Sequence, residues 1–140
     1  MFTFTLDAPA SGATAVRLEV FPDDSLPGRG PGRADNGNLH LSQVELLAFE
    51  PDAKAGRPVA IRSATADFNQ EGWTIAHSID GKDETAWGIH PNVGERHEAV
   101  FELSAFSTPQ VSVAEAGVFE VWGLAGGLAA LPLGVGLLLV

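Results

Sequence analysis

The sequence contains no cysteine in its 140 residues, and this excludes disulfide bonds, thiolate catalysis and zinc sites built on thiolates. Positive charge is also scarce, because 8 Lys and Arg residues are outnumbered by 18 Asp and Glu residues, for a formal net charge of −10. So acidic a chain repels phosphate, which argues against nucleic acid or an anionic membrane surface as a partner. The length suits one domain with its own buried core.

The motifs of common catalytic sites are missing as well. There is no Gly-x-Ser-x-Gly motif, and Gly28-Arg-Gly-Pro-Gly32 lacks the lysine and the following helix of a phosphate loop. The acidic pairs Asp23–Asp24 and Asp83–Glu84 are adjacent in sequence, unlike the separated acid and base of a glycosidase. Four histidines lack metal-ligand spacing and are predicted to lie at the surface: His40, His77, His90 and His97. We therefore expect a protein that is not an enzyme.

Apolar and polar residues alternate in several short runs, which is the pattern of half-buried strands. Strands are predicted over residues 2–7, 16–21, 39–48, 59–68, 87–89 and 99–103. Turns rich in Gly and Pro separate these runs, and one helical turn is expected within residues 73–79. The pattern predicts an all-β fold, an antiparallel β-sandwich of jelly-roll-like form. A change of parity at Ser42–Gln43 predicts a β-bulge.

A long loop rich in Gly and Pro interrupts the strand pattern over residues 22–38, and loops of this length are often functional. Its polar side chains, among them Arg33 and Asn36, suit sugar hydroxyls or a carboxylate. The alternative is an ordered connection held by Asx-turns at Asp35 and Asn36. Both interpretations stay open.

An oxygen-rich turn lies between residues 76 and 87. Asp80-Gly81 is a strong turn signal, because Gly adopts positive φ at little cost and Asp can accept a bond from its own backbone. The side chains of Asp80, Asp83 and Thr85, together with turn carbonyls, are the hard oxygen ligands that calcium takes. The alternative is a surface turn without metal, whose Trp87 closes the end of the sandwich.

This turn resembles a known signature. Ile79-Asp80-Gly81-x-x-x-Thr85-x-Trp87 is similar to the signature loop of discoidin, or coagulation-factor C-type, domains of the galactose-binding-domain-like superfamily. A wider set of segments resembles the variant of this module in large, cytochrome-c-linked bacterial surface proteins. These segments are Ala15-Val-Arg-Leu-Glu-Val20, Gly30-Pro-Gly-Arg-Ala-Asp-Asn-Gly-Asn38, Leu41-Ser-Gln-Val-Glu-Leu46, Ala64-Thr-Ala-Asp-Phe68 and Ala99-Val-Phe-Glu-Leu103. The resemblance covers residues 2–103, and the chain departs from the family pattern from Ser104 onward.

The resemblance implies a non-catalytic module that binds carbohydrate through loops at one end of the sandwich. It also implies a structural calcium ion held by Asp80, Asp83 and Thr85. A further carboxylate that the related modules supply near the C-terminus has no clear equivalent here, so calcium binding is expected to be weak or absent.

Sugar binding needs an exposed aromatic face and planar hydrogen-bonding groups, although each Trp is also a candidate for the core. The candidates for these groups are Trp73, His90, Asn92, Arg96, Arg33 and Asn36. The alternative function is a structural spacer or protein-interaction domain on the same fold, without a sugar site.

The end of the chain differs in composition. Residues 121–140 carry no charged side chain, and 20 residues at helical rise span about 30 Å, the thickness of a bilayer's hydrocarbon core. We expect a galactose-binding-like sandwich over residues 1–117 and an apolar tail over 118–140 that forms a membrane-anchoring helix. The alternatives are a truncated or misread end, or a last strand supplied by residues 110–121.

The first residues show a strand pattern and lack the basic segment and cleavage site of a signal peptide. We expect a monomeric module of a larger protein, located on the extracytoplasmic side or at the cell surface.

Overall fold

The computed structural model describes residues 2–8, 13–48, 53–104, 115–124 and 135–139. Within these residues the chain forms strands and two short 3-10 helices, η1 (Pro27–Arg29) and η2 (Ile75–Ile79). The strands are β1 (Phe2–Ala8), β2 (Ala15–Val20), β3 (His40–Ala48), β4 (Arg57–Pro58), β5 (Ile61–Ala66), β6 (Trp87–Gly88), β7 (His97–Leu103), β8 (Glu115–Leu124) and β9 (Val135–Leu139). The single helical turn expected within residues 73–79 is confirmed as η2.

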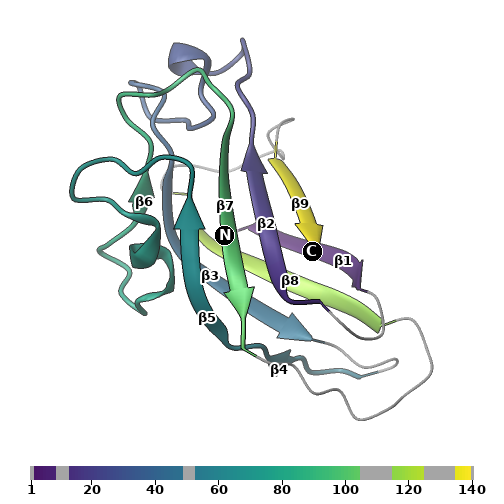
Figure 1. Cartoon of the computed structure of the whole chain (residues 1–140). Helices are drawn as coiled ribbons and strands as arrows, with labels where there is room; N and C mark the ends of the chain where they lie inside the picture. The colour runs from purple at the N-terminus through teal and green to yellow at the C-terminus, as the bar shows by residue number, and fades with distance from the viewer. Residues whose placement is uncertain (1, 9–12, 49–52, 105–114, 125–134, 140) are drawn as a thin grey trace.

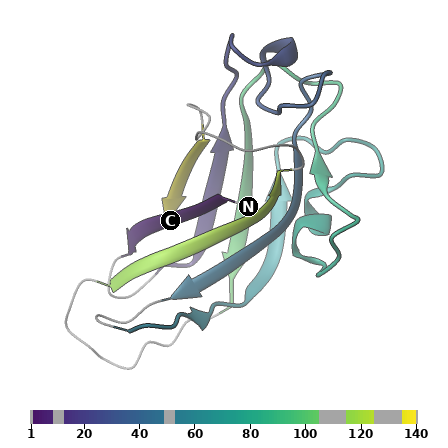
Figure 2. The same cartoon turned by 180° about the vertical axis from the view of Figure 1, so that it is seen from behind.

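The strands form two antiparallel sheets, which confirms the expected all-β fold (Figure 1). One sheet has the order β1-β8-β3-β4, with β6 also paired to β3, and the other has the order β5-β7-β2-β9. Figure 2 shows the first sheet from behind, with its strands running obliquely to those of the second. The arrangement is β-sandwich-like.

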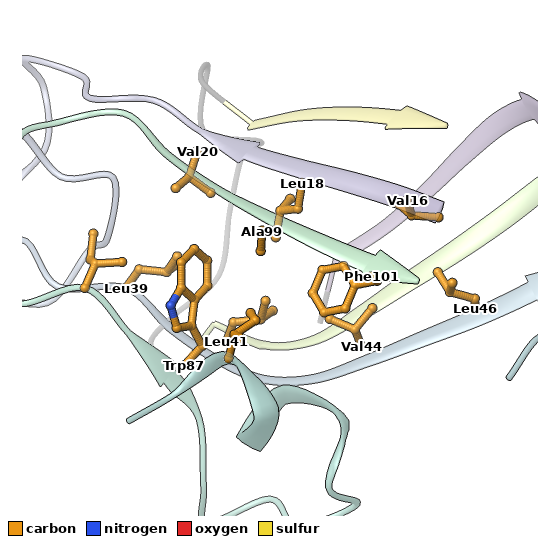
Figure 3. Packing of buried hydrophobic residues seen from close by; sticks show 12 residues of the cluster. Val16, Leu18, Val20, Leu39, Leu41, Val44, Leu46, Trp87, Ala99 and Phe101 are labelled. Carbon is orange, nitrogen blue, oxygen red and sulfur yellow. The ribbon is translucent and has the colours of Figure 1, made fainter. Parts of the chain in front are cut away.

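The hydrophobic core lies between the two sheets, as the alternation in β2 illustrates. Val16, Leu18 and Val20 are buried, while Arg17 and Glu19 between them are partly exposed. They meet buried residues of β3, β6 and β7, as Figure 3 shows: Leu41, Val44, Leu46, Trp87, Ala99 and Phe101. Complete burial of a large apolar side chain contributes about 1.5–3 kcal/mol.

Trp87 belongs to this core. Its side chain has no exposed surface, and its Nε1–H donates to the carbonyl of Phe68 at 2.9 Å. This hydrogen bond satisfies the only polar group of the indole, so the ring can be buried at little cost. The burial of Trp87 therefore agrees with its interpretation as a core side chain.

The buried residues of β3 change parity as predicted, but the predicted β-bulge is wrong. Leu41 and Val44 are both buried although they have opposite parity. The register with β8 is continuous, because Leu41 pairs with Leu124 and Gln43 with Trp122. The change of parity falls where β3 loses its other neighbour, since pairing with β6 ends at Leu41.

The structure differs from the helix expected over the tail. Strand β8 crosses the boundary predicted at residues 117–118, and Val135–Leu139 forms β9. β8 pairs with β1 on one edge and β3 on the other, while β9 pairs with β2. These partners satisfy backbone groups that an isolated apolar segment would satisfy by forming a helix. The alternative of a strand within residues 110–121 is closer to what is observed.

Among the described residues, no helix is long and apolar enough to cross a membrane. The remainder of the predicted tail helix, residues 125–134 and 140, lies outside the described residues.

Candidate functional site

Three connections carry the candidate sugar-binding residues: the loop after β2, the loop between β5 and η2, and the loop before β7. In Figure 1 the first and third meet at the upper end of the molecule. The second lies beside β6, where Gln70 and Trp73 form an isolated bridge. Each loop is long in sequence, so its position depends on contacts with the other two.

Asn38 joins these three connections. It is 7% exposed, and its Oδ1 accepts the backbone N–H groups of Ile89 at 3.0 Å and His90 at 2.9 Å. Its Nδ2 donates to Gln70 Oε1 at 2.8 Å and to His40 Nε2 at 3.2 Å. A carboxamide offers two acceptor lone pairs and two hydrogens, so all four are used. This buried amide is therefore fully satisfied.

The Asn38 amide also determines the tautomer of His40. Two backbone N–H groups fix Asn38 Oδ1 as the acceptor, so Nδ2 must be the atom that faces the imidazole. His40 Nε2 therefore accepts, and the neutral ring carries its hydrogen on Nδ1.

His40 is stacked on Trp73, with ring centroids 4.5 Å apart and an interplanar angle of 11°. Both residues are partly exposed. Their approach depends on Gly88, because a Cβ at that position would lie 2.6 Å from Gln70 Oε1 and 3.3 Å from Trp73 Cβ. His40 and Trp73 thus form a partly exposed pair of stacked rings, and the hydrogen bond from Asn38 holds the His40 ring.

The other predicted sugar ligands divide into two groups. His90 is exposed, and its backbone N–H donates to the same Asn38 that binds His40. Asn92 follows in the same loop and is exposed. Arg96 is engaged elsewhere, with NH2 at 2.6 Å from Glu19 and 2.8 Å from Glu98. The hydrogen bond to Glu19 is the main reason that the pKa of Arg96 lies above its ordinary value.

In the loop after β2, the Asx-turn interpretation of Asn36 is confirmed. Asn36 Oδ1 accepts the backbone N–H of Asn38 at 3.0 Å, so this side chain serves the loop's own fold. Arg33 is partly exposed in the same loop. The structure thus links the Trp73–His40 pair to the loop of His90 through Asn38, and it gives Asn36 and Arg96 structural partners.

The prediction that all four histidines lie at the surface is wrong for His97. His97 is only 3% exposed and lies beside Phe68, with their ring centroids 5.9 Å apart. Its Nε2 donates to the carbonyl of Asn92 at 2.7 Å, and Nδ1 lies 3.0 Å from Asp67 Oδ2. Burial is tolerated because both ring nitrogens have partners.

The predicted metal ligands are only partly brought together. Thr85 Oγ1 lies 2.8 Å from Asp80 Oδ2 and 3.0 Å from Oδ1, and the backbone N–H of Lys82 donates to Asp80 Oδ1 at 2.9 Å. Asp83 is exposed and takes no part in this set. Over the part of the chain that the structure describes, no group of three or more His, Cys, Asp and Glu side chains is placed to hold a metal ion.

The Asp80 carboxylate is stabilised in its charged form. Partial loss of solvent raises its pKa, but hydrogen bonds from Thr85, Lys82 N–H and Gln43, with the positive charge of Lys82, outweigh that effect. The pKa of Asp80 therefore lies below its ordinary value of 3.8. The hydrogen-bond donors of the turn thus stabilise the negative charge of the Asp80 side chain.

Sequence reasoning missed the two glutamines that complete these sites. Gln70 accepts from Asn38 across 32 positions of sequence, and Gln43 reaches Asp80 across 37. Gln43 lies in a segment of the family resemblance, but no local pattern connects Gln43 or Gln70 with a partner so far away in the sequence.

Comparisons with known proteins add no relative. No family model, no curated protein and no solved structure matches the chain.

Proposed function

We propose that the chain is a non-catalytic carbohydrate-binding module of a bacterial surface protein, with the jelly-roll-like, galactose-binding-like topology that its sequence resembles. The observation that carries the proposal is the partly exposed Trp73–His40 stack. Aromatic rings pack against the apolar C–H face of a pyranose, and the rigid Asn38 support would hold this platform in place without a sugar. The module would then bind its ligand with little rearrangement.

The hydrogen-bonding groups around the platform suit a sugar with neutral hydroxyls. His40 Nδ1–H is a donor whose orientation is set by the Asn38 contact, and the His90 and Asn92 side chains lie on the adjoining loop. The net charge of −10 disfavours anionic glycans. Arg33 completes the proposed set, whereas Asn36 and Arg96 act by positioning the loops that carry it.

A structural calcium ion near Asp80 and Thr85 stays a prediction of the family resemblance. The donors there are a carboxylate, a hydroxyl and carbonyls, which is the chemistry calcium selects. A bound ion stabilises the native state, so a melting temperature that rises in millimolar calcium would support this implied site, and an unchanged melting temperature would speak against it.

The alternative is a spacer or protein-interaction domain without a sugar site. The observation that favours it is that Asn36 and Arg96, two of the predicted sugar ligands, are engaged within the protein.

A glycan array probed with the full chain separates the two functions. Under the carbohydrate proposal a neutral glycan binds, Trp73→Ala weakens binding about tenfold or more, and Trp73→Phe retains most of it because a ring remains. Thr65→Ala, an exposed change on β5, is the matched control. If no glycan binds the wild-type chain, the spacer function is favoured. If a glycan binds and Trp73→Ala binds it as well as wild type does, the sugar site does not include the Trp73–His40 stack.

A further inference from the structure

The side chain of Gln43 lies at the meeting point of the oxygen atoms in the Asp80 turn. Its Nε2 is 3.2 Å from Asp80 Oδ1, 3.1 Å from the Lys82 carbonyl and 3.4 Å from the His77 carbonyl. Its Oε1 accepts the backbone N–H of Gly81 at 3.3 Å. A strand residue thus closes a turn that begins 37 positions later in the sequence.

More acceptor oxygens surround Gln43 Nε2 than it has hydrogens to donate. An amide nitrogen has two hydrogens, but three acceptor oxygens face this one, so they must share them. The distances of 3.1–3.4 Å, longer than the 2.9–3.0 Å typical of N–H···O bonds, agree with such sharing. A carboxylate and two carbonyls around one centre are otherwise the surroundings of a hard cation.

The orientation of the Gln43 amide is nevertheless determined. Turning it over would direct Oε1 at three acceptor oxygens and set Nε2 against the N–H of Gly81, with repulsion on both sides. A cation at the Nε2 position would need that reversal or the removal of the side chain. As they stand, the residues of the turn therefore fit an amide N–H₂ group and do not fit calcium.

We infer that the Gln43 side-chain amide takes the place of a cation in this turn, so that the Asp80–Thr85 arrangement is closed by hydrogen bonds without calcium. The inference concerns the metal dependence of the fold and does not rest on sugar binding. It explains why a single carboxylate, Asp80, suffices here: the donors supplied by Gln43, Lys82 N–H and Thr85 match one negative charge.

The inference predicts that a carboxylate at position 43 creates a requirement for metal. Gln43→Glu replaces the N–H₂ donor with an anion beside Asp80, and two neighbouring carboxylates repel unless a cation lies between them. Gln43→Met keeps the length of the side chain but removes the amide, so it measures the loss of the hydrogen bonds alone.

The test compares melting temperatures of the full chain in a chelator and in millimolar calcium. Wild type should melt at the same temperature in both, Gln43→Met should melt about 2–8 °C lower in both, and Gln43→Glu should melt lowest in chelator and recover with calcium. A terbium titration, followed by luminescence, should give Gln43→Glu at least about tenfold tighter binding than wild type. Adding Asp80→Asn to Gln43→Glu should abolish that gain.

Three results would overturn the inference: a calcium-dependent rise in wild type, a Gln43→Met variant that melts like wild type, or a Gln43→Glu variant that calcium does not restore. None of these depends on the glycan array. A failure of the carbohydrate proposal would therefore leave this result untouched, and the reverse is also true.

Discussion

Two side-chain amides, one just before β3 and one within it, hold the two candidate sites, and they do so in different ways. Asn38 is buried and makes four hydrogen bonds, with each of its hydrogens and lone pairs matched to one partner. Gln43 is partly exposed and directs two hydrogens at three acceptors. The Asn38 amide therefore has one partner for each donor and acceptor position, whereas the Gln43 N–H₂ group has more acceptors than hydrogens.

The difference follows from solvent access. A buried amide must be matched completely, because each unpaired buried group costs about 1–3 kcal/mol. At a partly exposed amide, water can satisfy what the protein does not, so an imperfect set of partners is tolerated. We therefore expect the Asn38 region to be rigid and sensitive to substitution, and the Gln43 region to be adaptable.

The largest effect should come from a pair of glycines that contrasts the crowding of the two regions. A Cβ on Gly32 would lie 1.6 Å from the carbonyl oxygen of Asn38, so Gly32→Ala should cost about 3 kcal/mol or more. Gly81 has φ of +75° and nothing within 4 Å of an added Cβ, so Gly81→Ala should cost only about 1 kcal/mol of backbone strain. Urea unfolding of the full chain measures both, and equal costs would contradict the difference in packing.

A second pair separates the acceptor and donor halves of the Asn38 amide. Asn38→Ala leaves the N–H groups of Ile89 and His90 unpaired and should cost about 2–3 kcal/mol. Asn38→Asp keeps the acceptor for both N–H groups, but it buries a carboxylate that faces Gln70 Oε1, so it should cost at least as much stability. Hydrogen exchange should show faster exchange of these two amides in Asn38→Ala alone. Equal exchange in both variants would show that Asn38 Oδ1 does not hold this loop.

A third pair divides the aromatic platform into hydrogen bonding and stacking. His40→Phe keeps a ring on Trp73 but offers no acceptor to Asn38, and it should cost about 1 kcal/mol. His40→Ala removes the ring as well and should cost a further 0.5–1.5 kcal/mol, roughly the value of an aromatic pair. If His40→Ala and His40→Phe unfold at the same urea concentration, the stack contributes nothing to stability.

The smallest effect is a pH dependence in the Gln43 region. The folded-state pKa of Asp80 lies below 3.8, so its contribution to stability is present above that pH and is lost as pH falls through the lower folded-state value. Asp80→Asn has no such titration, and the difference in melting temperature between wild type and variant should shrink at acid pH. Thr85→Val, which removes one of the donors, should reduce the pH-dependent part. A difference that stays constant with pH would show that the Asp80 charge is not stabilised by the fold.

Much of the fold, and part of the site, could be predicted from local pattern. Alternation identified the buried face of β2, and the Asp80-Gly81 turn with its Thr85 partner lies within six residues. The Asx-turn at Asn36, one of two interpretations that the sequence leaves open, is local as well, since its bond spans two positions. The burial of Trp87 agrees with its interpretation as a core residue.

The tail shows where such reasoning stops. Twenty uncharged residues predict a helix when each segment is considered alone, but whether a segment becomes a strand depends on an open sheet edge elsewhere in the chain. β8 finds that position between β1 and β3. No property of residues 115–124 themselves specifies these neighbours.

The sequence by itself determined the alternation of the strands, the core face of β2 and the turn at Asp80, because each depends on residues close together in the chain. Only the tertiary structure decided which amide serves which loop: Asn38 meets Ile89 across 51 positions, and Gln43 meets Lys82 across 39. The physical reason is that periodicity is set by the geometry of one strand. The partners of a side-chain amide are set by which strands and loops come to lie side by side.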